Sequence, residues 1–135
     1  ALVPITGQGD PDAFALGATI ECAVTHGAVR CWQTDENDVW HAPLDPFTSE
    51  PVANLPPVSR VVAGWDHAVG RTTDGHVYEW SVPSAQAKEK PAVRGAIDIA
   101  AGHLFTCALL PNATVKCWGE KSVMSFFPPS MVLED

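Results

Sequence analysis

The sequence predicts an all-β chain made of repeated β-hairpins, and two observations lead to this prediction. First, residues 17–32, 64–80 and 102–119 each contain two short runs in which apolar and polar residues alternate around a turn. Second, each stretch begins at a glycine and carries a tryptophan at or near its end. The leading glycines, at positions 17, 64 and 102, are 47 and then 38 residues apart, near the period of about 40 to 50 residues of a four-stranded propeller blade. We therefore expect β-propeller blades, in three repeats.

Equivalent positions of the three hairpins carry related residues. The fifth residue after the leading glycine is Cys22, Val69 or Cys107, and the tryptophans near the hairpin ends are Trp32, Trp80 and Trp118. The turn of the second hairpin is Asp74-Gly75, because glycine accepts the positive φ that a tight hairpin turn requires. We expect the repeated tryptophans to lie in the core.

A short apolar run precedes each leading glycine, over residues 13–16, 58–63 and 97–101. These runs hold small and β-branched residues, which suit the crowded axis of a propeller, and we expect them to form the inner strands. We interpret residues 1–135 as a single domain, with repeats over approximately 13–55, 56–90 and 91–127. Residues 128–135 resemble the beginning of another repeat, so we expect them to act as a closing strand.

Three blades do not close a ring, since propellers have about four to eight. An open propeller exposes sheet faces and edges that favour association. We therefore expect a homodimer in which two copies of the chain form one six-bladed ring, burying both open ends.

The four cysteines fall into two local pairs. Cys22 and Cys31 lie on opposite strands of the first predicted hairpin, and Cys107 and Cys117 on opposite strands of the third. The second hairpin lacks both cysteines together, as expected if they act as pairs. We predict two disulfides, each inside its own repeat, and hence a secreted protein. The alternative is a cytosolic protein with four reduced, buried cysteines.

A glycosylation sequon, Asn112-Ala-Thr114, lies at the predicted tip of the third hairpin. A glycan is sterically tolerable there. This weakly supports a secreted glycoprotein.

Composition excludes some partners. The chain has 135 residues, with 16 acidic against 8 basic residues and a net charge of −8. A phosphate backbone or an anionic membrane would therefore be repelled, and we expect neither nucleic acid nor membrane insertion. No apolar run approaches the roughly 20 residues that span a bilayer.

No catalytic constellation is evident. The sequence lacks the nucleophile elbow, the phosphate-binding glycine loop and the common zinc and redox motifs. The acidic run from Asp35 to Asp38 lacks the spacing of a calcium loop. We expect a non-catalytic protein without a metal or other cofactor.

Two tryptophans are not repeated, Trp40 and Trp65, and they are the best candidates for ligand binding. Trp40 lies in the longest connection, beside Asn37, Asp38 and His41. An exposed indole near carboxylate and amide acceptors suits a sugar, whose apolar face stacks on the ring. The alternative is that Trp40 covers the edge of its own blade or packs in a subunit contact.

The second hairpin also resembles the repeat of the regulator of chromosome condensation family. The residues that match are Gly64, His67, Asp74, Gly75, Val77, Tyr78 and Trp80. Cys107-Ala-Leu and Val115-Lys-Cys117-Trp118-Gly119 are similar to the cysteine-bearing version in secreted and cell-surface relatives, such as plant crinkly-type receptor ectodomains. Bacterial β-lactamase inhibitor propellers share that fold. The resemblance implies a propeller, but the family typically has seven repeats, and its nucleotide-exchange activity does not transfer to the residues matched here.

These observations favour a secreted carbohydrate-binding, lectin-like propeller, with Trp40, His41, Asp38, Asn37 and Trp65 as its ligand-binding residues. The alternative is a protein-binding module or enzyme inhibitor that uses one face of the propeller.

Overall fold

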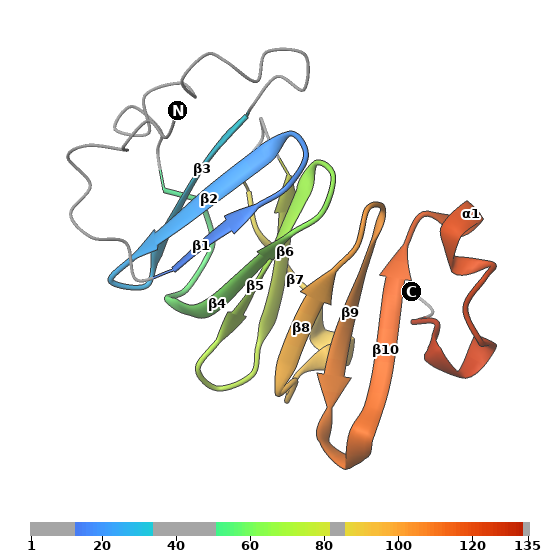
Figure 1. Cartoon of the computed structure of the whole chain (residues 1–135). Coiled ribbons are helices and arrows are strands. Elements are labelled where there is room, and N and C mark those ends of the chain that lie inside the picture. The colour runs from blue at the N-terminus through green and yellow to red at the C-terminus, as the bar shows by residue number, and fades with distance from the viewer. Residues whose placement is uncertain (1–12, 34–50, 82–85, 134–135) are drawn as a thin grey trace.

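The computed structural model describes residues 13–33, 51–81 and 86–133, and these form three antiparallel β-sheets in chain order (Figure 1). The first sheet contains β1 (Ala13–Leu16), β2 (Ile20–Thr25) and β3 (Ala28–Gln33). The second contains β4 (Val58–Ala63), β5 (His67–Thr72), β6 (Val77–Ser81) and β7 (Lys88–Glu89). The third contains β8 (Asp98–Ala101), β9 (Phe105–Leu110) and β10 (Thr114–Gly119). The predicted all-β class is confirmed.

The three predicted hairpins are β2–β3, β5–β6 and β9–β10. Their turns differ as the sequence does. In the first hairpin Thr25 pairs with Ala28, so only His26 and Gly27 form the loop, with φ of 51° and 81°. In the third, the turn is a 3₁₀ segment, η2 (Pro111–Ala113), in which Asn112 has φ 69°. Glycine and asparagine tolerate these left-handed conformations, which suits Gly27 and Asn112 to the tips, although His26 and Ala113 adopt positive φ there as well.

The register of the hairpins places the predicted cysteine pairs directly opposite each other. Cys22 pairs with Cys31 and Cys107 with Cys117, and each pair is joined by a disulfide with a Cα–Cα distance of 4.1 Å. The equivalent pair in the second sheet is Val69 and Glu79. Both predicted disulfides are confirmed.

The inner-strand prediction is also confirmed. The runs before the leading glycines form β1, β4 and β8, and β4 contacts both β1 and β8. The glycines are needed for this approach: a Cβ added to Gly17 would overlap the carbonyl oxygen of Gly64, and a Cβ on Gly64 that of Gly102. Gly17 and Gly64 therefore let the next repeat come close.

Hydrogen bonds join the loops that follow these glycines. Ala18 donates its backbone N–H to the oxygen of Gly64 at 3.2 Å, and Trp65 donates to the oxygen of His103 at 2.9 Å. The three sheets are thus connected by backbone bonds as well as by packing.

Two apolar clusters fill the space between the sheets. The first lies between the first and second sheets and includes Ile20, Cys22, Val61 and Trp80. The second lies between the second and third sheets and includes Val69, Ile99, Ala108 and Trp118. The repeated tryptophans are buried, as predicted.

Two segments differ from a simple repeat. After η1 (Pro91–Val93) closes the second repeat, the chain enters β8; after β10 it forms a short helix, α1 (Lys121–Met124), and a 3₁₀ turn, η3 (Pro129–Met131). Val132 then forms a single parallel bridge with Cys117, and Leu133 donates to the Cys117 oxygen at 2.7 Å. Residues 128–133 therefore lie beside β10, not among the inner strands (Figure 1).

Candidate functional site

A groove of about 900 Å³ lies where the second and third sheets meet the C-terminal segment. Its charged lining residues are Asp66, Glu79, Lys90, Glu120 and Lys121. Its apolar lining includes Leu104, Phe105, Trp118, Met124 and Leu133. The volume lies within the range of roughly 300 to 1,000 Å³ that is usual for ligand sites.

The wall of the groove is built around Trp118. This buried indole donates its Nε1–H to the Glu79 carboxylate on β6, and the Lys90 ammonium lies 5.7 Å from its ring centroid. The cation and the carboxylate thus contact different parts of one ring, which keeps both charges at the groove. Glu79 stands where the other two repeats have cysteine, so the groove has a carboxylate at the repeat position that carries no disulfide.

A second polar contact connects the two sheets. The His67 Nε2 lies 3.0 Å from the Oγ1 of Thr106, whose side chain is almost fully buried. The contact joins the second and third sheets and so gives His67 a structural role. In each repeat the leading glycine donates its backbone N–H to the carbonyl oxygen three residues later, so Ile20, His67 and Phe105 occupy equivalent positions.

The residues that directly follow the second and third leading glycines, Trp65 and His103, form an aromatic pair. The rings of Trp65 and His103 have centroids 4.4 Å apart, with Trp65 half-buried and His103 exposed. The Thr19 hydroxyl donates to the Trp65 oxygen at 3.0 Å, and the exposed Asp66 follows Trp65 in the chain. Trp65 therefore joins neighbouring loops while keeping part of its ring accessible.

A charged cluster lies at the β5–β6 turn. Thr72 donates its hydroxyl to Asp74, and this bond holds the pKa of Asp74 below its ordinary value. Arg94 donates both Nε and Nη2 to Glu89 at 2.7 Å, which lowers the pKa of Glu89 and raises that of Arg94. His76 Nδ1 lies 3.0 Å from the Glu89 carboxylate, so this half-buried ring belongs to the cluster.

Some of the other predicted site residues lie within the described part of the chain and some lie outside it. Asn37, Asp38, Trp40 and His41 lie outside the described residues, so their arrangement stays a prediction. Asn112 and Thr114 are exposed at the tip of the third hairpin. Within residues 13–33, 51–81 and 86–133, no group of three metal-binding side chains is close enough to hold an ion. No helix in that part of the chain is long and apolar enough to cross a membrane.

The groove residues were missed by sequence reasoning. Glu79 and Trp118 are far apart in sequence and become neighbours only when adjacent sheets pack. The one available signal was the replacement of a cysteine by a glutamate in the second repeat.

Comparison with known proteins shows the fold. No protein-family model matches the sequence, and no curated protein matches it. Among solved structures, Prp20p from Saccharomyces cerevisiae is similar with a TM-score of 0.63 and 17% identity, over 82% of this chain and 31% of that chain. The CRINKLY WD40 ectodomain of the Arabidopsis thaliana receptor kinase ACR4 is similar with a TM-score of 0.58 and 25% identity, over 99% of this chain and 42% of that chain.

The ectodomain of the Physcomitrella patens receptor kinase CR4 gives a TM-score of 0.60 at 19% identity, over 93% of this chain and 34% of that chain. The chain thus spans between about a third and two fifths of the length of these neighbours. The three sheets are propeller repeats.

Proposed function

We propose that the chain is a non-catalytic protein-binding module that acts in an oxidising, extracellular compartment. The observation that carries the proposal is the groove between the second and third sheets. It is large enough for a short peptide segment, and it combines apolar side chains with fixed charges of both signs. Such a mixture suits a peptide more than a uniformly apolar or uniformly charged ligand.

The neighbours are consistent with this proposal. The study of Prp20p describes binding to Gsp1p and histones, and two other neighbours are receptor ectodomains. Propellers offer a rigid surface, so a bound peptide orders without rearranging the scaffold.

A selection from phage-displayed 12-residue peptides against the folded chain tests the proposal. We expect enriched peptides whose affinity falls at least tenfold in Lys121→Glu, which reverses a charge in the groove. The matched control is Arg60→Glu, a charge reversal at an exposed side chain of β4 outside the groove, and it should leave the affinity unchanged. Peptides whose affinity is unchanged in Lys121→Glu, or the absence of any enriched peptide, would refute a binding module that uses the groove.

The extracellular location rests on the cysteines. All four are in disulfides, and none is free. Such bonds persist in oxidising compartments and are rare in the cytosol. Thiol titration of the secreted protein in denaturant should find no free thiol before reduction and four afterwards. Free thiols in native protein recovered from its own source would argue for the cytosolic alternative.

Carbohydrate binding is the second candidate, and the accessible Trp65 ring favours it. Trp65 lies beside the exposed Asp66 and His103, so a stacking ring and hydrogen-bonding groups occur together. A glycan array probed with the wild-type chain, Trp65→Ala and Trp40→Ala tests both predicted aromatic sites. Signals lost in either variant but kept in Phe126→Ala, an exposed ring elsewhere, would support it. An array without signals would leave the lectin interpretation without support.

A further inference from the structure

Each sheet has two chemically distinct faces. The face that carries the disulfide position, named here the disulfide face, has the rows Ala15–Cys22–Cys31 in the first sheet, Val62–Val69–Glu79 in the second and Ala100–Cys107–Cys117 in the third. The opposite face, named the tryptophan face, carries Trp32, Trp80 or Trp118. Residues directly opposite one another in a sheet share a face, so the register fixes this assignment.

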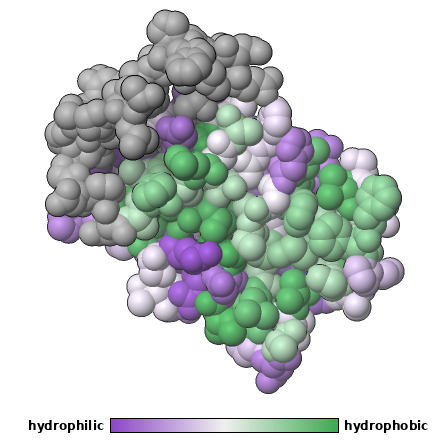
Figure 2. Space-filling model, in the orientation of Figure 1, coloured by the Kyte–Doolittle hydropathy of each residue, from purple (hydrophilic) through white to green (hydrophobic). Residues whose placement is uncertain are grey.

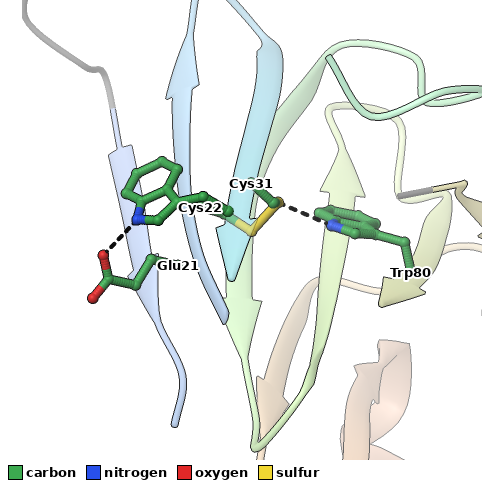
Figure 3. The surroundings of a disulfide bond; sticks show 5 residues. Glu21, Cys22, Cys31 and Trp80 are labelled. Atoms are coloured by element: carbon green, nitrogen blue, oxygen red, sulfur yellow. Dashed lines mark hydrogen bonds between the residues drawn. A yellow bond between two sulfur atoms is a disulfide. The ribbon is translucent and has the colours of Figure 1, made fainter. Parts of the chain in front are cut away.

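Inside the chain these two faces always meet. Trp80, on the tryptophan face of the second sheet, donates its indole N–H to Cys31 Sγ on the disulfide face of the first sheet at 3.1 Å (Figure 3). Trp118 of the third sheet repeats the contact, donating to Glu79 of the second. The interface between sheets is therefore one contact used twice, with cysteine or glutamate as acceptor.

Two faces have no neighbouring sheet within the described residues. One is the disulfide face of the third sheet, where Ala100 is exposed and Leu109 and Val115 are half-buried. The other is the tryptophan face of the first sheet, where Phe14 and Leu16 are 67% and 64% exposed, although Trp32 on the same face is only 5% exposed. On the side of the molecule drawn in Figure 2, hydrophobic areas surround a hydrophilic patch.

The first-sheet side chains are more exposed than their equivalents in the second sheet. Phe14 stands three residues before its leading glycine, as Val61 does in the second sheet, and Val61 is only 6% exposed because the first sheet covers it. Leu16 stands at the position of Ala63, which packs against the same cluster. Larger apolar residues at exposed docking positions indicate a covered surface.

We propose that a second copy of this chain covers both faces. The tryptophan face of one copy's first sheet packs on the disulfide face of the other copy's third sheet, and a twofold axis repeats the contact. The occupant is a second copy because each open face is of the type that the other already binds inside the chain. Six sheets then form one closed ring, as the sequence predicts, and no open face is left.

The internal interface specifies which residues meet. Ala15 of β1 and Ala63 of β4 pack in one cluster, and their equivalents are Ala100 in the third sheet and Leu16 in the first. Leu16 of one copy should therefore contact Ala100 of the other. Glu21 lies on the tryptophan face of the first sheet beside Leu16. Its carboxylate accepts the Trp32 indole N–H at 2.8 Å within the chain.

Native mass spectrometry and cysteine cross-linking of the 135-residue chain test the proposal. We expect a mass of twice the 14.4 kDa chain, and at least a tenfold weaker dimer for Leu16→Asp. The matched control, Ile97→Asp, changes an apolar side chain that is 56% exposed beside β8 and alternates to the other face of the third sheet, so it should leave the dimer intact.

Leu16→Cys combined with Ala100→Cys separates this arrangement from other dimers. Mild oxidation should give a cross-linked dimer on a non-reducing gel, whereas Ile97→Cys with Ala100→Cys should not. This double variant adds no charge, so it also covers the case in which Leu16→Asp fails to fold. A single-chain mass at 100 µM, or a dimer without the Leu16–Ala100 cross-link, would overturn the proposal.

Discussion

The two disulfides close loops of nearly equal size, yet their removal should have different effects. Sequence separations are 9 for Cys22–Cys31 and 10 for Cys107–Cys117. The chain-entropy model then gives a loss of about 2.6 and about 2.7 kcal/mol when each pair is changed to alanine. By loop closure alone, the two double variants should be indistinguishable.

The contact with Trp80 breaks this equality. Cys31 Sγ accepts the indole N–H of Trp80, which is buried, while no Trp donates to the third-sheet disulfide within the described residues (Figure 3). Changing Cys31 to alanine leaves a buried donor unpaired, which costs about 1 to 3 kcal/mol. We therefore expect the first-sheet variant to lose about 4 to 5 kcal/mol of unfolding free energy, against about 3 for the third-sheet variant.

Urea unfolding followed by tryptophan fluorescence measures both values, with circular dichroism at zero urea to confirm folding. A Trp80→Phe variant provides the control, because in its background the two disulfide deletions should cost the same. Equal losses in the wild-type background, or a larger loss for the third sheet, would refute a stabilising indole–sulfur contact.

Two further predictions concern the repeat glycine and the acidic cluster. Gly64→Ala should cost more than about 2 kcal/mol in urea unfolding, because its Cβ would overlap the Gly102 oxygen, whereas Gly95→Ala, with φ 90° and open space around it, should cost only about 1 to 2. A smaller effect at Gly64 would mean that the sheets do not depend on this close approach. The lowered pKa values of Asp74 and Glu89 favour the folded state above the ordinary carboxyl pKa, and this stability is lost as the pH falls through their folded values. Asp74→Asn should therefore flatten the decline of the urea midpoint between pH 5 and pH 2, and an unchanged slope would contradict it.

Local features of the fold could be predicted because they depend on short stretches of chain. A hairpin with a tight turn has its register fixed by the turn, so the spacing of Cys22 from Cys31 was sufficient to place them opposite each other. The same reasoning placed Val69 opposite Glu79. The leading glycines were recognised from their repetition, although their steric reason became clear only in the packed structure.

Contacts between sheets could not be predicted in this way. The groove joins β6 to β10 and the C-terminal segment, and nothing in the local pattern indicates which side chains will meet there. The position of the C-terminal segment is another contact that the local pattern does not give. Pro128-Pro129 followed by apolar residues resembles the start of a repeat. Its backbone bonds instead join it to Cys117 in β10.

One repeat position connects stability with the proposed site. At the position of Cys31, the side chain must accept an indole N–H from the next sheet, and a disulfide sulfur or a carboxylate can do so. The second repeat uses Glu79, which keeps the acceptor but gives up the covalent link within its own sheet. A carboxylate carries charge and a second oxygen that a sulfur does not have, so the contact with Trp118 leaves Glu79 able to bind a donor from a ligand. The groove proposed as the binding site therefore lies at the repeat that has a carboxylate in place of a disulfide.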